Sequence, residues 1–331
     1  MLYPTFRPLL FGLDPERAHR LALRALGATG RLPPRDPPGT AVDLMGLRFP
    51  NRVGLAAGFD KSAEAVDGLG RLGFGFIEVG TVTPRPQHGQ PRPRLFRHPR
   101  RNALVNRLGF PNDGAAAVAS RLERRRYRGV LGVNIGKNAE TPIECALDDY
   151  VSCLRALHGV ADYIALNISS PNTVALRDLH EPARLEPLLS GVLGERDRLL
   201  RGSGRRLPVL LKVSPDLDSG ALRDVARVAQ RVNLDGLVAT NTTVQRAGVG
   251  AHWASESGGL SGAPLHRLAL AAVTALRELM GPRFPIVGVG GIDSAAKGAA
   301  MRAAGADLVQ IYTGLIYRGP ALVGKLARAL D

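Results

Sequence analysis

Cysteine is scarce in this 331-residue chain, and neither of its two copies belongs to a recognisable motif. Cys145 and Cys153 are eight positions apart, with no CxxC pair and no histidine cluster beside them. This spacing argues against a disulfide framework or a zinc site, so we expect two reduced, structural thiols in a cytosolic protein. The seven histidines are scattered along the chain, which predicts no metal site.

Long apolar runs are also missing. No stretch reaches the roughly 18 consecutive apolar residues that a membrane-spanning helix needs. The first residues lack the apolar core and the small-residue cleavage site of a secretory signal. With 45% hydrophobic and 22% charged residues, the sequence predicts a folded protein with ample material for a core, in one large domain or two modest ones.

Positive charge is in excess. The chain has 44 lysines and arginines against 29 acidic residues, which gives a net charge of +15. Such a field attracts polyanions or an anionic membrane surface. It also fits an arginine-rich protein with solvated basic faces, as the stretch RRRYR at 124–128 indicates. The charge by itself does not decide between these interpretations.

After residue 50 the sequence repeats one pattern: a short apolar run, a polar or glycine-rich end, and a helical stretch. The runs are 52–58, 76–83, 130–136, 163–170, 209–214, 236–242, 285–291 and 308–314. The helical stretches include 115–126, 146–158, 219–232, 265–280 and 295–303. Near-continuous apolar runs are typical of parallel strands covered on both faces, and eight such units predict an α/β protein with a (β/α)8 TIM barrel. An open doubly wound sheet is the alternative, weakened because no GxGxxG follows the first run.

A small helical unit precedes the predicted barrel. Phe6, Leu9, Leu10 and Leu13 repeat at helical spacing, and Asp14 before Pro15 predicts the start of a second helix. On this second helix Ala18, Leu21, Ala22 and Ala25 are expected opposite Arg17, Arg20 and Arg24. Two amphipathic helices with basic faces are typical of segments that lie on a membrane, and a helical hairpin packed on the barrel fits the same pattern. The proline-rich stretch at 31–39 predicts a stiff linker, so we divide the chain into 1–37 and 38–331.

Polar groups gather at the predicted strand ends, where a barrel carries its chemistry. In chain order these are Ala57, Gly58, Asp60, Lys61, Thr81, Asn134, Asn167, Ser170, Lys212, Thr240, Asn241, Thr242, Gly290, Gly291, Tyr312 and Thr313. Burying lysines and amides without partners costs several kcal/mol. An ion-pair network explains one lysine, but Asp60 is the one carboxylate at these ends, so a bound anionic, amide-rich ligand explains the set better.

Glycine-rich loops follow the last strands. GVGGID at 288–293 and YTGLI at 312–316 occupy the two loops where such barrels cradle phosphate, and GGLSG at 258–262 is a third contributor. Glycines there could merely make turns, but together they predict a phosphorylated cofactor. Lys212 would then stabilise a flavin that becomes anionic on reduction, and Lys61 the negative group of the substrate.

These motifs resemble one family, the membrane-associated, quinone-dependent (class 2) dihydroorotate dehydrogenases. The matching stretches are AAGFDK, GTVTPRPQ, PRPRLFR, NRLGF, VNIGKN, NISSPNT, ATNTT, GGLSG, GVGGI and LVQIY, with LDPERAHRLAL in the N-terminal helices. The resemblance spans almost the whole chain, and Phe59 is its one visible departure. It implies an FMN enzyme that oxidises (S)-dihydroorotate to orotate in pyrimidine (UMP) biosynthesis and passes the electrons to a membrane quinone.

The resemblance also assigns contacts to residues. For FMN it implies Ala57, Gly58, Phe59, Asp60, Lys61, Thr81, Asn134, Asn167, Lys212, Thr240, Gly262, Gly291, Tyr312 and Thr313. For the substrate it implies Lys61, Asn106, Arg107, Leu108, Gly109, Phe110, Asn167, Asn172, Asn241 and Thr242. Dihydroorotate has a carboxylate that suits Lys61 and a cyclic ureide that suits asparagine amides.

The stretch NISSPNT at 167–173 would supply the base. The resemblance implies that Ser170 removes a proton while a hydride goes to the flavin. A serine hydroxyl is a poor base, so it needs a relay, for which Thr173 and a water are the candidates. Turn formation is the structural alternative for both residues. Cytosolic relatives use a cysteine here, and neither cysteine of this chain occupies that place.

The N-terminal helices would form the mouth of a tunnel from lipid to the flavin. His19 and Arg97 match the polar groups that meet the quinone head in this family, and Tyr312 is expected near the flavin on that route. The basic exterior suits anionic lipid, so the resemblance implies a peripheral protein on the cytoplasmic face of the cell membrane. A monomer is compatible with the sequence, which leaves the oligomeric state open.

Three rival functions are weighed against this one. A flavin barrel that acts on RNA, such as a dihydrouridine synthase, would be basic but gives no reason for NISSPNT. A nucleic-acid-binding protein without catalysis gives no reason for the glycine loops and two lysines. A soluble dehydrogenase that uses fumarate or NAD would lack residues 1–37. We therefore expect no nucleic-acid partner.

Overall fold

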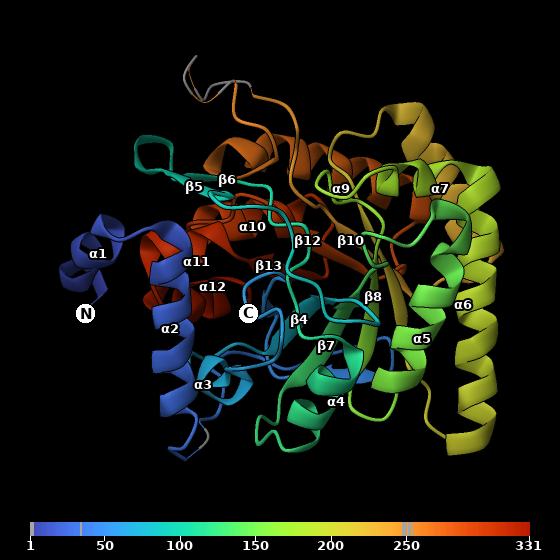
Figure 1. Ribbon diagram of the computed structural model, residues 1–331, viewed down its shortest axis with the longest axis horizontal. Helices are drawn as coiled ribbons and strands as arrows, with labels where there is room; N and C mark the ends of the chain where they lie inside the picture. The colour runs from blue at the N-terminus through green and yellow to red at the C-terminus, as the bar shows by residue number, and fades with distance from the viewer. Residues whose placement is uncertain (1–2, 34, 247–249, 251–252, 254) are drawn as a thin grey trace.

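The computed structural model describes residues 3–33, 35–246, 250, 253 and 255–331. At its centre eight parallel strands close into a barrel (Figure 1). In chain order they are β3 (Val53–Leu55), β4 (Phe76–Val82), β7 (Val130–Ile135), β8 (Tyr163–Asn167), β9 (Val209–Val213), β10 (Gly236–Ala239), β12 (Ile286–Val289) and β13 (Leu308–Ile311). Each predicted run contains one of these strands, so the TIM barrel is confirmed and the open sheet is excluded.

Helices surround the barrel. They are α3 (Val66–Gly70), α4 (Ala115–Glu123), α5 (Ala146–Leu157), α6 (Pro182–Ser203), α7 (Ser219–Arg231), α9 (His266–Met280), α10 (Ala295–Ala303), α11 (Thr313–Arg318) and α12 (Ala321–Ala329). Short 3₁₀ turns lie at Pro99–Arg101, Ile143–Cys145, Leu176–His180 and Ala263–Leu265. The five predicted helices are α4, α5, α7, α9 and α10, each within three residues of its expected ends.

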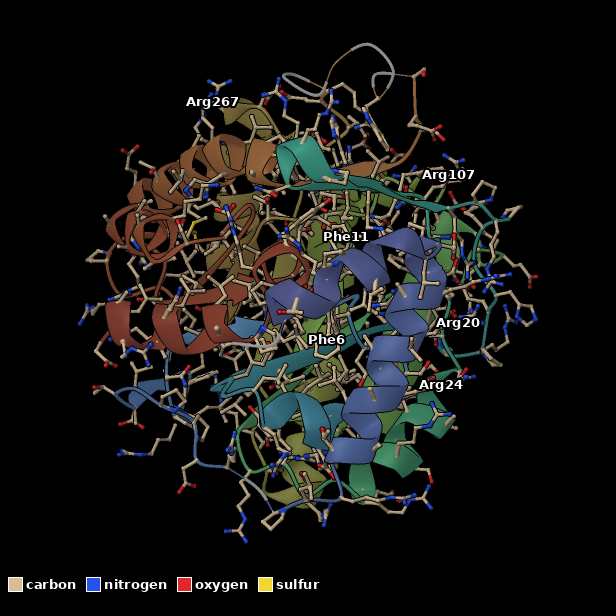
Figure 2. All side chains as sticks on the ribbon, turned by 90° about the vertical axis from the view of Figure 1, so that its left-hand side faces the viewer. Phe6, Phe11, Arg20, Arg24, Arg107 and Arg267 are labelled. Atoms are coloured by element: carbon tan, nitrogen blue, oxygen red, sulfur yellow. The ribbon has the colours of Figure 1, made fainter. Side chains whose placement is uncertain are left out.

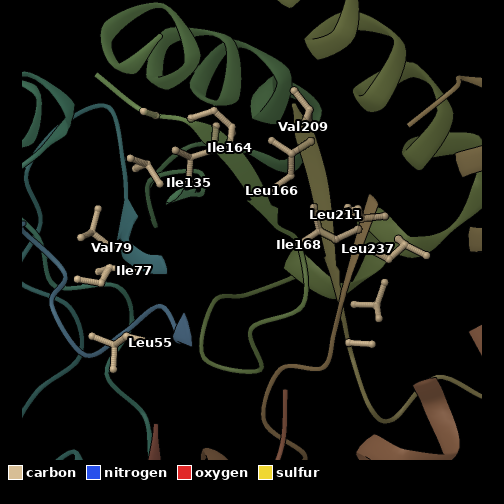
Figure 3. Packing of buried hydrophobic residues seen from close by; sticks show 14 of the residues in the cluster. Leu55, Ile77, Val79, Ile135, Ile164, Leu166, Ile168, Val209, Leu211 and Leu237 are labelled. Atoms are coloured by element: carbon tan, nitrogen blue, oxygen red, sulfur yellow. The ribbon is translucent and has the colours of Figure 1, made fainter. Parts of the chain in front are cut away.

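The strands divide their side chains between two cores, because successive residues of a strand point to opposite faces. Ile77 and Val79 point outward and pack with the outward residues of neighbouring strands beneath the helices (Figure 3). Phe76 and Tyr163 point into the barrel. A Cβ on Gly132 would lie 2.1 Å from the Tyr163 ring, so this ring fills space that only a glycine leaves free.

Two smaller sheets lie beside the barrel. The hairpin of β1 (Val42–Leu44) and β2 (Leu47–Phe49) brings Phe49 against Phe76, with ring centroids 5.4 Å apart. On the other side, β5 (Leu95–His98), β6 (Ala103–Asn106) and β11 (Gly259–Gly262) form an antiparallel sheet in the order β11-β6-β5. The sequence did not predict this sheet, which pairs Asn106 with Gly259.

The N-terminal unit consists of α1 (Tyr3–Gly12) and α2 (Pro15–Thr29). The predicted start of α2 is confirmed, because the Asp14 side chain accepts a hydrogen bond from the N–H of Arg17 at 2.9 Å. No helix in the described parts of the chain is both long and apolar enough to cross a bilayer.

The predicted apolar side of α2 is partly wrong. Leu23 is the buried residue of this helix, whereas Leu21 and Ala25 are exposed. Alanines carry little information about burial, so the larger Leu23 decides which side packs on the barrel. Leu21 itself is 51% exposed.

Candidate active site

A cavity opens at the carboxyl ends of the barrel strands and encloses about 930 Å³, including space open to solvent. Its walls contain these predicted residues: Ala57, Gly58, Lys61, Thr81, Asn106, Leu108, Gly109, Phe110, Asn167, Ser170, Asn172, Lys212, Thr240, Asn241, Thr242, Gly262, Gly291, Tyr312 and Thr313. Most of the predicted site therefore converges on one space, because parallel strands direct their carboxyl ends to the same side of the barrel.

Other predicted residues lie outside this cavity. They are His19, Phe59, Asp60, Arg97, Arg107, Asn134 and Thr173. The carboxylate of Asp60 accepts hydrogen bonds from the N–H groups of Glu64 and Ala65, each at 2.8 Å, and so shapes the loop after β3. The Arg107 side chain pairs with Glu256 at 2.8 Å. Contacts of Asp60 and Arg107 with ligands stay predictions.

A buried hydrogen-bond chain links four strand ends at the base of the cavity. Asn241 Nδ2 donates to Asn167 Oδ1 at 3.0 Å, and Asn167 Nδ2 donates to Thr81 Oγ1 at 2.8 Å. Thr81 Oγ1 donates to Asn134 Oδ1 at 2.6 Å. The chain ends at Glu78 on β4, whose carboxylate accepts from Asn134 Nδ2 at 2.9 Å.

Glu78 is a residue that the sequence reasoning missed. It is fully buried inside the barrel and also accepts hydrogen bonds from Tyr163 Oη at 2.9 Å and Gln310 Nε2 at 2.8 Å. A buried carboxylate is stable only when other groups compensate its charge. The signal was present as one acid in the otherwise apolar run FIEVGTVT, which indicates a polar network inside the barrel.

The two lysines of the cavity differ in their partners. Lys212 on β9 is 5% exposed, and its ammonium makes no hydrogen bond to any residue that the structure describes. Burial lowers the pKa of Lys212, and the charge of Glu78 opposes that shift. Lys61 Nζ donates to the carbonyl of Gly58 at 2.5 Å. Burial, followed by the charge of Arg94, lowers the pKa of Lys61 to about 8.

Ser170 follows β8 and faces the cavity while only 5% exposed. Its Oγ accepts a hydrogen bond from the N–H of Asn172 at 3.2 Å, and Asn172 Nδ2 donates to Asn106 Oδ1 at 3.2 Å. Within the described residues no hydrogen bond joins Thr173 to Ser170. Both residues line a second opening toward solvent, so a relay between them stays a prediction.

Arg177, which the sequence reasoning also missed, braces the loops around Ser170. Its guanidinium donates to the carbonyls of Ser169 and Thr242, each at 3.3 Å, and pairs with Asp216 at 3.0 Å. These contacts connect the loops after β8, β9 and β10.

The glycine loops approach each other with little room between their backbones. Gly262 has φ +94°, and a Cβ there would lie 2.2 Å from the carbonyl oxygen of Asn102. A Cβ on Gly291 would lie 2.7 Å from the carbonyl oxygen of Gly262. Ser261 Oγ and Thr313 Oγ1 are 2.9 Å apart beside them. Glycine is therefore required here, and it leaves peptide groups at the cavity wall.

A third hollow lies between α2 and the segment 86–95, and it shares Lys61, Leu108 and Tyr312 with the cavity. The rings of His19 and Phe59 meet edge to face at 5.0 Å, and those of Phe59 and Tyr312 at 5.6 Å. Burial, with the charge of Lys61, lowers the pKa of His19 to about 4, so this imidazole is neutral at neutral pH.

Arg97 does not line this hollow. It donates to the carbonyl of Leu10 at 3.0 Å, contacts the carbonyl of Leu13 and lies 4.7 Å from the centre of the Phe11 ring. These contacts hold the turn between α1 and α2, so a role of Arg97 toward a quinone stays a prediction.

Comparisons with known proteins agree with this geometry. The family model of dihydroorotate dehydrogenase matches residues 40–331. A protein of Methylococcus capsulatus named dihydroorotate dehydrogenase (quinone) is 51% identical, over 100% of this chain and 99% of that protein. One of the same name from Aromatoleum aromaticum is 49% identical, over 99% of this chain and 95% of that protein.

A solved structure leads to the same family. The crystal structure of DHODH from Eimeria tenella in complex with ferulenol has a TM-score of 0.89 and 38% identity, over 97% of this chain and 93% of that chain. Fold and site thus define a (β/α)8-barrel oxidoreductase with a polar cavity at its strand ends. The chain belongs to the dihydroorotate dehydrogenase family.

Proposed function

We propose that this protein oxidises dihydroorotate to orotate with bound FMN and delivers the electrons to a membrane quinone, in pyrimidine biosynthesis. The observation that carries the proposal is the cavity in which Ser170, Lys61, Lys212 and the asparagine amides meet. Relatives of about half identity over the whole chain, which carry the quinone-dependent name, support it.

The walls of the cavity suit FMN. Lys212 would hold the flavin ring, because its buried ammonium has no protein acceptor among the described residues. The peptide groups at Gly262 and Gly291 would hold the phosphate, since glycine loops let an anion approach the backbone N–H groups. FMN supplies the acceptor for the hydride that leaves dihydroorotate. The positive charge of Lys212 favours a ring that gains electrons.

The other residues would bind and deprotonate the substrate. Ser170 Oγ would take the proton next to the carbonyl while its own hydroxyl proton passes to solvent through the opening that it lines, and the Asn172 N–H that already points at this oxygen would stabilise it as charge develops. Asn167 and Asn172 would hold the ureide ring. Lys61 would hold the carboxylate, because its pKa of about 8 leaves it charged at neutral pH.

The hollow beside α2 would admit the quinone. It reaches Tyr312 and so borders the cavity, and His19 and Phe59 form its inner wall. Apolar side chains on α1 and α2 are open to solvent, with Leu9 exposed by 71% and Phe6 by 52%. Figure 2 shows Phe6 on the same side of the molecule as Arg20 and Arg24 of α2. This combination suits an anionic lipid surface.

The decisive experiment follows the FMN absorbance of the purified protein. Dihydroorotate without oxygen should bleach the bound FMN, and a short-chain quinone should restore the colour, whereas fumarate or NAD should not. A protein that carries no yellow cofactor and cannot be reconstituted with FMN would contradict the proposal. Bleaching reversed by NAD or fumarate would leave the oxidation of dihydroorotate intact and overturn the quinone as acceptor.

A further inference from the structure

The hydrogen bonds of the buried chain below the cavity all run the same way from donor to acceptor. The Glu78 carboxylate accepts hydrogen bonds from Tyr163, Gln310 and Asn134, so the amide nitrogen of Asn134 faces it. The Asn134 oxygen then faces Thr81 and uses its hydroxyl hydrogen. The Thr81 oxygen is left to accept from Asn167.

The same logic reaches the top of the chain. Because Asn167 Nδ2 is committed to Thr81, Asn167 Oδ1 is the acceptor for Asn241 Nδ2. Asn241 Oδ1 is then turned to the N–H of Thr242 at 2.8 Å. The acid at the bottom of the barrel thus orients Asn134 directly, while the N–H groups of Ser169 and Thr242 orient the Asn167 and Asn241 oxygens in the same direction from the top.

We propose that Glu78 is a positioning residue, a buried carboxylate that fixes the Asn134 amide and, through Thr81, holds Asn167 in place toward the flavin and the substrate. This inference rests on the proposed function. Glu78 itself does not line the cavity, so it acts through the chain and not by contact. Its charge also supports the protonated state of Lys212.

Two neighbours of Glu78 provide a test that distinguishes a positioning role from a packing role inside the barrel. Tyr163 and Gln310 bind the same carboxylate, at 2.9 and 2.8 Å, but they are not part of the amide chain. Tyr163→Phe therefore removes one hydrogen bond of Glu78 and leaves both its charge and its contact with Asn134. This variant is the matched control for Glu78→Gln, which removes the carboxylate charge that anchors Asn134 at the lower end of the chain.

The test measures the dissociation constant of FMN by fluorescence and the KM and kcat for dihydroorotate. We expect Glu78→Gln to raise the FMN dissociation constant and the KM each about tenfold, with a smaller change in kcat, because it weakens the charge-assisted bond to Asn134. Tyr163→Phe should change each less than about twofold, because it leaves the Glu78 carboxylate and its bond to Asn134 in place. A folded Glu78→Gln protein within twofold of the unaltered protein in both constants would overturn the inference.

An exchange variant adds a rescue. The double variant combines Glu78→Gln with Gln310→Glu. Its new acid at position 310 accepts from the amide nitrogen of residue 78, so the amide oxygen of residue 78 faces Asn134. Both constants should therefore return to within about threefold of those of the unaltered protein. A folded exchange variant no better than Glu78→Gln, or an exchange variant that fails to fold while Tyr163→Phe folds, would overturn the inference. If the unaltered protein is not bleached by dihydroorotate, the proposed function fails instead, and the FMN titration still reports on Glu78.

Discussion

Lys61 gives the sharpest test of how the substrate is bound. Its ammonium lies against the Gly58 carbonyl in the wall of the cavity, and burial together with the Arg94 charge lowers its pKa to about 8. One pH unit above the pKa only about one lysine in ten keeps its proton. If protonated Lys61 binds the carboxylate of dihydroorotate, kcat/KM should fall about tenfold for each pH unit above 8.

The assay is the pH profile of kcat/KM for dihydroorotate, which reports ionisations of the free enzyme. Lys61→Arg keeps its charge at every pH of the assay, so the fall above pH 8 should vanish. Lys61→Met should raise KM by roughly 10- to 100-fold, as expected for one charge-assisted hydrogen bond. Lys325→Gln, which removes an exposed lysine of α12, should leave the profile unchanged. A Lys61→Arg enzyme that still loses activity near pH 8 would refute this reasoning.

The same shift has a consequence for stability. The folded pKa of Lys61 is lowered from 10.5 to about 8, so the folded state holds this proton less tightly than the unfolded state. The protonated lysine therefore costs stability below pH 8, and the cost is relieved as the pH rises from 8 toward 10.5. Lys61→Met should accordingly raise the Tm at pH 7, and this gain should shrink in alkaline buffer.

Four further changes have definite expected outcomes. Ser170→Ala should retain FMN but slow its reduction by dihydroorotate about 10²- to 10⁴-fold in stopped-flow absorbance, and near-normal reduction would remove Ser170 as the base. Lys212→Ala should lose FMN on gel filtration, and a protein that stays yellow would argue against its placement. Leu9→Glu should weaken binding to anionic liposomes while FMN reduction stays unchanged; equal binding would contradict the membrane face. Gly132→Ala should lower the free energy of unfolding by about 1–3 kcal/mol in denaturant titration, because a Cβ would lie 2.1 Å from the Tyr163 ring. An unchanged free energy of unfolding would show that the ring can move.

The barrel was predictable because its strands are buried on both faces and read as apolar runs. The cavity followed from the same reading, since polar residues such as Asn167 and Lys212 stand where those runs end. The β5-β6-β11 sheet was not predictable in this way. Its strands are four residues long, and the partners Asn106 and Gly259 are far apart in the chain, so no local pattern marks their pairing.

Other misses have different physical causes. Glu78 interrupts an apolar run with one acid, and only the assembled barrel shows that Asn134, Tyr163 and Gln310 surround it. The orientation of α2 was misjudged because several of its small residues tolerate either face. Arg97 matched a family motif, but its contacts with Leu10 and the α1–α2 turn became visible only once those segments were placed.

Two hollows share wall residues with the cavity, one lined by Ser170 and Asn172 and one lined by His19 and Phe59. A water-soluble reactant and a lipid-soluble reactant would then enter by different routes. Neither would have to leave before the other could bind. Turnover would proceed as two half-reactions that meet only at the cofactor. A compound bound beside α2 should therefore allow one reduction by dihydroorotate and block reoxidation by the quinone, so that the reduced enzyme accumulates.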